Sequence, residues 1–101
     1  MLTLTSAQKK SLRSMAHHLK PVVLVGSSGI KEQVIAALDE ALEDHELVKV
    51  RFQDHKEEKK ALTAQLVEET KAGLAGIVGH VAILYRPRKE AKDRTIVLPG
   101  N

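Results

Sequence analysis

Two glycines that flank two serines, at residues 26–29, form the motif of this sequence that could bind a ligand directly. Glycines let a backbone turn sharply and approach a ligand closely, and the unpaired amides of a helix start favour phosphate. The motif follows a short apolar segment, and helical periodicity begins at Ile30. The pattern predicts a phosphate contact, although a turn that merely connects a strand to a helix looks the same. The predicted contacts in this motif are Gly26, Ser27, Ser28 and Gly29, with Lys31 as a nearby charge.

Basic residues gather near both ends of the chain. The net charge of +3 and the pI near 9.3 indicate a polyanionic partner only weakly. Residues 1–20 contain four basic side chains and no acidic one. The four basic side chains share one arc of a predicted helix with a histidine. This arc predicts a surface that binds phosphates. The predicted contacts on it are Lys9, Lys10, Arg13, His17 and Lys20, and the secondary candidates are Lys49, Arg51, Arg86 and Arg88.

The chain shows no arrangement of residues suited to catalysis. It has no cysteine, and its five histidines lack the paired spacing of metal ligands. It contains no nucleophile elbow and no nucleotide-binding glycine motif. We therefore expect no catalytic residue, metal or cofactor. Phe52 and Tyr85 are the only aromatic residues of the Phe, Tyr and Trp types, so base stacking is not expected. If the ligand is RNA, structured or double-helical RNA fits better than an extended strand.

The apolar patterns predict one α/β domain with the element order α-β-α-β-α-β-β and helices mainly on one side of a small mixed sheet. The first helix begins at Thr5 or Ser6 and ends before Pro21. Residues 22–25 predict a strand that is central or covered on both sides. The predicted core stripe of the first helix is Leu12, Met15, Ala16 and Leu19.

Later segments complete this pattern. A second helix starts at Ile30, and residues 47–52 alternate, with Val48, Val50 and Phe52 directed to the core and Lys49 and Arg51 to the other side. Asp54 is expected to cap a helix over 56–71. Strands 76–78 and 81–85 join at Gly79-His80, the signature of a type II′ turn. Residues 96–98 add an edge strand or only dock. No apolar stretch approaches the about 20 residues that a membrane-spanning helix needs, and the first ten residues lack the apolar core of a signal peptide, so we expect a cytoplasmic protein.

Three stretches, at residues 19–29, 45–50 and 81–87, together resemble the YhbY-type proteins of the CRM (chloroplast RNA splicing and ribosome maturation) domain family. The resemblance implies an RNA-binding domain associated with precursors of the large ribosomal subunit. It also implies an α+β two-layer sandwich, similar to the C-terminal domain of translation initiation factor three, with sheet order 1-2-4-3. The family's Gly-x-x-Gly loop maps to residues 26–29. Many members carry a lysine or arginine inside this loop, whereas both middle positions here are serine.

The resulting hypothesis is a single CRM-type domain over residues 1–101, with a basic C-terminal extension at 88–101. We expect a monomeric, non-enzymatic protein that binds ribosomal RNA and acts in ribosome assembly. The alternative is a protein-interaction module. It would dock on a ribosomal protein or assembly factor through the acidic segment 31–46, which has a net charge of −5 from one lysine and six carboxylates.

Overall fold

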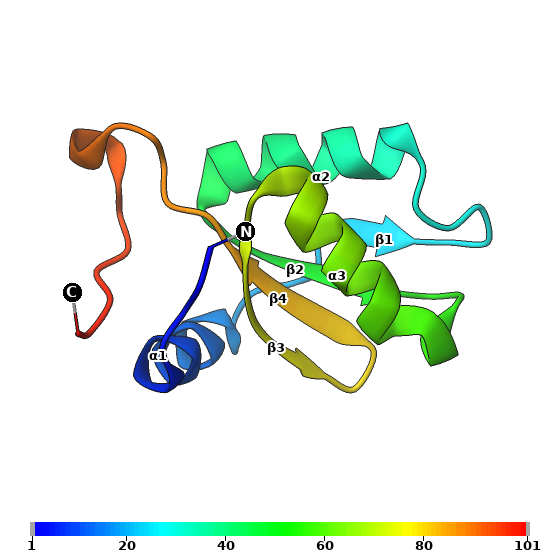
Figure 1. Cartoon of the computed structure of the whole chain (residues 1–101), viewed down its shortest axis with the longest axis horizontal. Helices are drawn as coiled ribbons and strands as arrows, with labels where there is room; N and C mark the ends of the chain where they lie inside the picture. The colour runs from blue at the N-terminus through cyan, green and yellow to red at the C-terminus, as the bar shows by residue number, and fades with distance from the viewer. Residues whose placement is uncertain (1, 101) are drawn as a thin grey trace.

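The computed structural model describes residues 2–100, which form a four-stranded sheet with helices on both faces (Figure 1). The helices are α1 (Ser6–Ala16), α2 (Glu32–His45) and α3 (Lys59–Thr70), and the short 3-10 helices are η1 (Lys56–Glu58) and η2 (Ala91–Asp93). The strands are β1 (Val23–Val25), β2 (Leu47–Phe52), β3 (Gly73–Val78) and β4 (Val81–Tyr85). The predicted order of elements is confirmed.

The sheet is mixed, with the strand order β1-β2-β4-β3, as the resemblance implied. β2 is parallel to β1 and antiparallel to β4. β3 pairs with β4 in antiparallel fashion, with a bulge between Leu74 and Gly76. β1 therefore lies at an edge, and Leu24 on it is 49% exposed. The prediction of a central or doubly covered strand is wrong, because an apolar run of this length does not reveal how many strands flank it.

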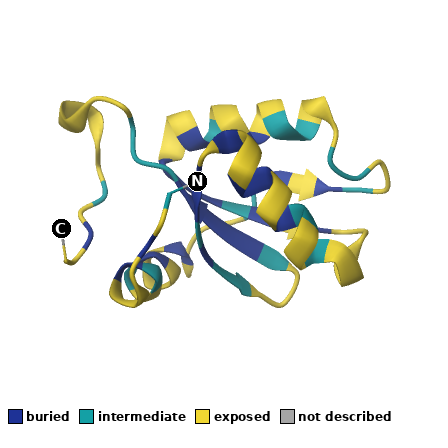
Figure 2. Cartoon of the chain, in the orientation of Figure 1, coloured by how far each residue is buried: buried dark blue, intermediate teal, exposed yellow. Residues whose placement is uncertain are grey.

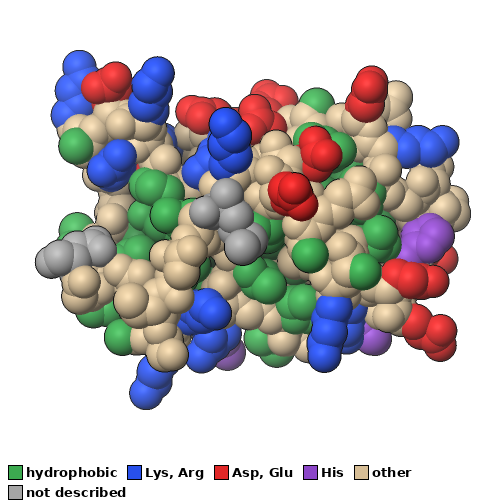
Figure 3. All heavy atoms as spheres, viewed as in Figure 1, with side chains coloured by type: hydrophobic (Ala, Val, Ile, Leu, Met, Phe, Trp, Pro, Cys, Tyr) green, Lys and Arg blue, Asp and Glu red, His purple; other side chains and the backbone are tan. Residues whose placement is uncertain are grey.

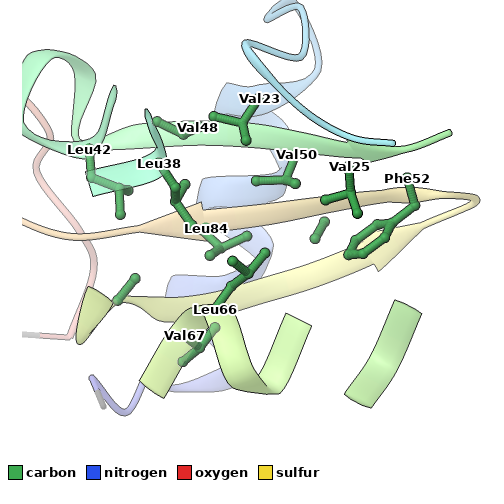
Figure 4. Packing of buried hydrophobic residues seen from close by; sticks show 12 residues of the cluster. Val23, Val25, Leu38, Leu42, Val48, Val50, Phe52, Leu66, Val67 and Leu84 are labelled. Carbon is green, nitrogen blue, oxygen red and sulfur yellow. The ribbon is translucent and has the colours of Figure 1, made fainter. Parts of the chain in front are cut away.

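α2 and α3 cover one face of the sheet and enclose the main core (Figure 4). Val48, Val50 and Phe52 are buried there, which confirms the alternation predicted for β2. Each large apolar side chain buried in this way contributes about 1.5–3 kcal/mol. The cluster drawn in Figure 4 includes Val23, Val25, Leu38, Leu42, Val48, Val50, Phe52, Leu66, Val67 and Leu84.

α1 covers the opposite face of the sheet, where Figure 2 shows a second set of buried residues. A reciprocal capping box fixes its start: Gln8 N donates to Thr5 Oγ1 (3.1 Å), and Thr5 N donates to Gln8 Oε1 (3.0 Å). Leu12 and Ala16 are fully buried in a cluster with Ile83. The prediction that helices pack mainly on one side holds for α2 and α3, whereas α1 lies on the other.

Several predicted boundaries are wrong. α1 ends at Ala16, four residues earlier than the Pro21 signal suggested, so Leu19 lies outside the helix and is 41% exposed. Met15 lies within the helix but is 37% exposed, so neither is a core residue. α2 begins at Glu32 rather than Ile30. η1 precedes α3, whose N-cap is Glu58, so Asp54 does not cap that helix. β3 begins at Gly73, three residues before the predicted strand. Helical periodicity marks the face of a helix better than its ends.

The segment after β4 docks on the fold without forming a strand. Leu98 is buried in the α1 cluster, whereas Val97 is exposed. The side chain of Glu46, between α2 and β2, secures this segment. Its Oε2 accepts a hydrogen bond from Arg88 N (2.7 Å), and its Oε1 accepts from Thr95 N (2.8 Å) and Thr95 Oγ1 (2.9 Å). The prediction for residues 96–98 is therefore settled in favour of docking.

Candidate nucleic-acid interface

A groove of about 570 Å³ lies between α1 and the face of the sheet that α1 covers. We call it the α1 groove. Basic side chains from two distant parts of the sequence meet there, because α1 crosses β2 on this face. Apolar residues of β3 and β4 form part of its lining, and no acidic residue among the described residues contributes. The lining residues are Lys10, Arg13, Ser14, His17, Pro21, Lys49, Arg51, Val78, Val81 and Ile83.

Arg13 is held in this groove by the bulge of β3. Its Nη1 donates to the carbonyl oxygen of Ala75 (2.8 Å). A Cβ at Gly76 would lie 2.9 Å from Arg13 Cδ, so the absence of a side chain at Gly76 lets the arginine pack on the strand. A guanidinium group has five N–H donors, and one bond to Ala75 leaves others for a ligand. The fold therefore orients this cation instead of leaving it mobile.

Lys49 is also anchored. Its Nζ donates to the carbonyl oxygen of Leu19 (2.9 Å), and this bond holds the segment between α1 and β1 against β2. Lys20, in the same segment, lines a neighbouring hollow of about 410 Å³ that is mainly apolar and that also touches Lys49. Lys9 is half-buried and lines neither hollow. Of the five residues predicted on the α1 arc, the structure thus brings Lys10, Arg13 and His17 into the groove.

The Gly-x-x-Gly loop is exposed at its two serines and closes as a tight turn, in which Gly29 N donates to Gly26 O (3.0 Å). Gly29 has φ +72°, a conformation that favours glycine. His55 packs against the loop, with its Nε2 3.0 Å from Ser27 O. A Cβ on Gly26 would have no atom within 4 Å, so the backbone is open to a ligand at this end.

The charge around this loop is mixed. A hollow of about 590 Å³, here the loop hollow, carries three carboxylates and one lysine. Lys31 is exposed just before α2, but the carboxylate of Glu32 lies in the first turn of that helix. This carboxylate offsets part of the positive potential that the helix dipole would otherwise offer to a phosphate. The helix start predicted at Ile30 therefore does not directly adjoin the loop. The residues of the loop hollow are Ser27, Gln53, Asp54, His55, Lys56, Glu57 and Glu58.

A smaller hollow connects the α1 groove with the loop hollow. It has a volume of about 270 Å³ and is lined by Arg51, Phe52, Gln53, Lys56 and His80; we call it the turn pocket, since the β3–β4 turn contributes His80. Arg51 also lines the α1 groove, and Lys56 also lines the loop hollow. The three hollows thus adjoin through shared residues, from α1 to the Gly-x-x-Gly loop. Sequence reasoning missed Lys56 and His80, because only the pairing of β2 with β4 brings them together.

The sequence is similar to known proteins over most of its length. The sequence matches the CRS1 / YhbY (CRM) domain over residues 4–86. This chain belongs to the CRM domain family. The matched region contains every lining residue of the α1 groove, the turn pocket and the loop hollow, and all of the apolar hollow beside Lys20 except Thr95 and Ile96.

Relatives of this CRM domain carry related names. An RNA-binding protein of Haemophilus influenzae is 44% identical over 93 residues, which cover 91% of this chain and 94% of that protein. The probable RNA-binding protein YqeI of Bacillus subtilis is 40% identical over 91 residues, covering 89% of this chain and 95% of that protein. The solution structure of a candidate RNA-binding protein of Staphylococcus aureus has a TM-score of 0.79 at 39% identity, and covers 96% of this chain and 100% of that chain.

Two of the predicted secondary contacts have another use in this CRM domain. The guanidinium group of Arg86 pairs with Asp39 Oδ1 (2.6 Å) and Glu43 Oε1 (3.1 Å) of α2, and donates to Thr70 O (2.8 Å). Arg88 Nε donates to Glu43 O (2.8 Å) at the end of α2, where a cation also interacts favourably with the helix dipole. Both arginines thus hold α2, on the face of the sheet opposite the α1 groove, so the structure does not bring them together with the other predicted contacts.

The acidic segment 31–46 is less free than its net charge suggested. Glu46 is fully buried, and Asp39 and Glu43 are paired with Arg86. In Figure 3 acidic side chains lie along α2 and basic ones at α1, while further acidic side chains lie over α3 and further basic ones around the C-terminal segment. The docking alternative, which relied on a free acidic helix, is accordingly not favoured.

No group of three or more His, Cys, Asp and Glu side chains between residues 2 and 100 is placed to hold a metal ion. Within the same range, every helix is too short or too polar to cross a lipid bilayer.

Proposed function

We propose that this CRM domain binds RNA through the α1 groove, without catalysing a reaction. The observation that carries the proposal is that five predicted contact residues, Lys10, Arg13, His17, Lys49 and Arg51, line one groove whose described lining contains no acid. Phosphates supply most of the affinity of RNA for such surfaces, and this kind of contact carries little sequence information. The names of the relatives support RNA as the class of ligand.

We further infer that the Gly-x-x-Gly loop is a second contact. Gly26 is open to a ligand, and the hydroxyl groups of Ser27 and Ser28 are exposed and can donate to phosphate oxygens. The three carboxylates of the loop hollow make this a weaker anion site than the α1 groove. Lys9, Lys20 and Lys31 would act from the edges of the surface.

The affinity for RNA should fall steeply as salt rises. Each neutralised phosphate contributes roughly −0.7 to −0.9 to the slope of log K against log salt, so four groove cations predict a slope near −3. Filter binding of a labelled RNA hairpin across a salt series measures this slope. A flat response would contradict binding by phosphate contacts.

The target that we propose is ribosomal RNA in precursors of the large ribosomal subunit, in the cytoplasm, with the domain acting as a monomer in ribosome assembly. The family resemblance supports this target. Sedimentation of a cell lysate tests it: the protein should travel with large-subunit particles, and RNase treatment should release it. Association that survives RNase would instead favour docking on a protein.

A further inference from the structure

The turn pocket has the composition of an anion site. Arg51 at the end of β2, Lys56 of η1 and His80 of the β3–β4 turn come from three different elements and line one small cavity. All three side chains are exposed, and the remaining lining residues, Phe52 and Gln53, carry no charge. The cavity lies between the α1 groove and the loop hollow, where an RNA backbone that contacts both would pass.

Lys59 of α3 positions the imidazole. Its Nζ donates to the carbonyl oxygen of Gly79 and lies 3.2 Å from His80 Nδ1. Because an ammonium group only donates, Nδ1 must accept, which leaves the ring proton on Nε2. The turn itself is fixed by Gly79, with φ +60°, and by the bond from Phe52 N to His80 O (2.8 Å). His80 is therefore neutral in this arrangement and has one N–H available.

The charges that face His80 all oppose its protonation. Partial desolvation and then the cations Lys59, Lys56 and Arg51 hold the pKa of His80 below its ordinary value of 6.5. These cations come from α3, η1 and β2, the elements that surround the turn. The acids of this region, Asp54, Glu57 and Glu58, line the loop hollow rather than the turn pocket.

We propose that the turn pocket binds one backbone phosphate of the RNA through Arg51, Lys56 and His80, and that His80 takes up a proton when the phosphate enters. This inference rests on the proposed RNA-binding function and adds a site and a proton to it. A phosphate would neutralise the cations that disfavour imidazolium and would accept a hydrogen bond from it. Once protonated, His80 no longer accepts a hydrogen bond from Lys59, whose ammonium group keeps its bond to the carbonyl oxygen of Gly79. The proton comes from solvent, and no covalent bond changes.

Linkage then requires that RNA affinity increases as pH falls. Binding that raises the pKa of a group is favoured wherever the free protein binds fewer protons than the complex. For a histidine whose pKa lies below 6.5 in the free protein, the gain appears as pH decreases through the range in which imidazole titrates, between about pH 5 and 8. Above that range His80 contributes only its neutral N–H.

The test measures the anisotropy of a fluorescein-labelled RNA hairpin at several values across that pH range, for the wild type, His80→Gln and His80→Lys. Because His17 lines the α1 groove as a second histidine, the informative quantity is the difference between wild type and variant. His80→Gln should lose about threefold to tenfold in affinity at the acid end and little at the alkaline end. His80→Lys should keep the affinity and make it less dependent on pH. His45→Gln is the matched control and should follow the wild type: His45 is exposed and lies outside the α1 groove, the turn pocket and the loop hollow, on the apolar hollow beside Lys20.

The outcomes separate this inference from the proposed function. If the wild type binds with a steep salt dependence, but His80→Gln has the same pH dependence as the wild type, the turn pocket proposal is overturned and RNA binding stands. If the wild type does not bind RNA, both fail. An NMR titration of the His80 ring gives a second measurement: its pKa should rise when RNA is added, and an unchanged value would also overturn the proposal.

Discussion

Replacing Glu46 with alanine should lower the free energy of unfolding by about 2–4 kcal/mol, because two amide donors would lose their acceptor in a partly buried site. The carboxylate accepts three hydrogen bonds, from the backbone of Arg88 and from the backbone and hydroxyl of Thr95. Glu46 is itself fully buried, so water cannot easily replace it. Urea unfolding of both proteins measures the difference, through a lower midpoint with an unchanged slope.

The effect of Glu46 should depend on pH. Burial alone would raise the pKa of this carboxyl, but hydrogen bonds from Thr95 and Arg88 outweigh burial and hold the pKa below 4.5. A group with a depressed native pKa stabilises the fold above its unfolded pKa, and this contribution is lost as pH falls through the native value. The difference between wild type and Glu46→Ala should therefore shrink as pH decreases below about 4.5. A difference that stays constant into acid would contradict the role of the charge.

A matched pair of variants separates the side chain from the backbone. Glu46 has φ +61°, in the region that favours glycine, so Glu46→Gly lacks the carboxylate but relieves the strain. We expect Glu46→Gly to be more stable than Glu46→Ala. Faster hydrogen exchange at Arg88 and Thr95, without any change in the urea midpoint, would show that the carboxylate secures only the C-terminal segment, contrary to the prediction.

Local patterns predicted the elements of the fold and failed where long-range packing decides. The alternation of β2 and the cap at Thr5 depend on a few neighbouring residues, and both are as expected. Glu46 looks like one more exposed acid in segment 31–46, and only the return of the C-terminal segment makes it a buried acceptor. Leu19 falls on the apolar stripe of a longer helix than the one that forms, since α1 ends at Ala16. The periodicity of the sequence reveals neither the burial of Glu46 nor the end of the first helix.

The basic surface shows the same division. Spacing on one helix predicted that Lys10, Arg13 and His17 would share a face, and they line one groove. Arg86 adds a positive charge to the basic segment in the sequence, but in the structure it forms ion pairs with acidic residues of α2. These acidic residues lie more than forty positions away in the sequence, so local patterns do not reveal the pairing. His80 lies in a two-residue turn with no basic neighbour in sequence, and it joins the basic surface only because β4 pairs with β2.

Reversing two charges in the α1 groove, with Lys10→Glu and Arg51→Glu together, should reduce the affinity for RNA about hundredfold at low salt and lower the salt slope by about 2. These positions suit the test better than Arg13 or Lys49, whose side chains also support the fold through bonds to Ala75 and Leu19. Within residues 2–100, Lys10 and Arg51 have exposed side chains with no hydrogen bond or ion pair to break. The unfolding midpoint should therefore change little.

The matched control for this double variant is a reversal on the C-terminal extension, Lys92→Glu, on the exposed helix η2. It alters the total charge by the same amount per site but lies outside the α1 groove, the turn pocket and the loop hollow. If RNA affinity depended only on net charge, the single reversal would cost half the binding free energy that the double reversal costs. The control would then lose roughly tenfold in affinity, against about hundredfold for the double variant. If RNA lies in the groove, Lys92→Glu should bind almost as well as the wild type. The double variant should lose affinity to the same extent for every RNA sequence, because phosphate contacts do not distinguish bases. A loss of affinity confined to one RNA sequence would instead place base recognition in the groove.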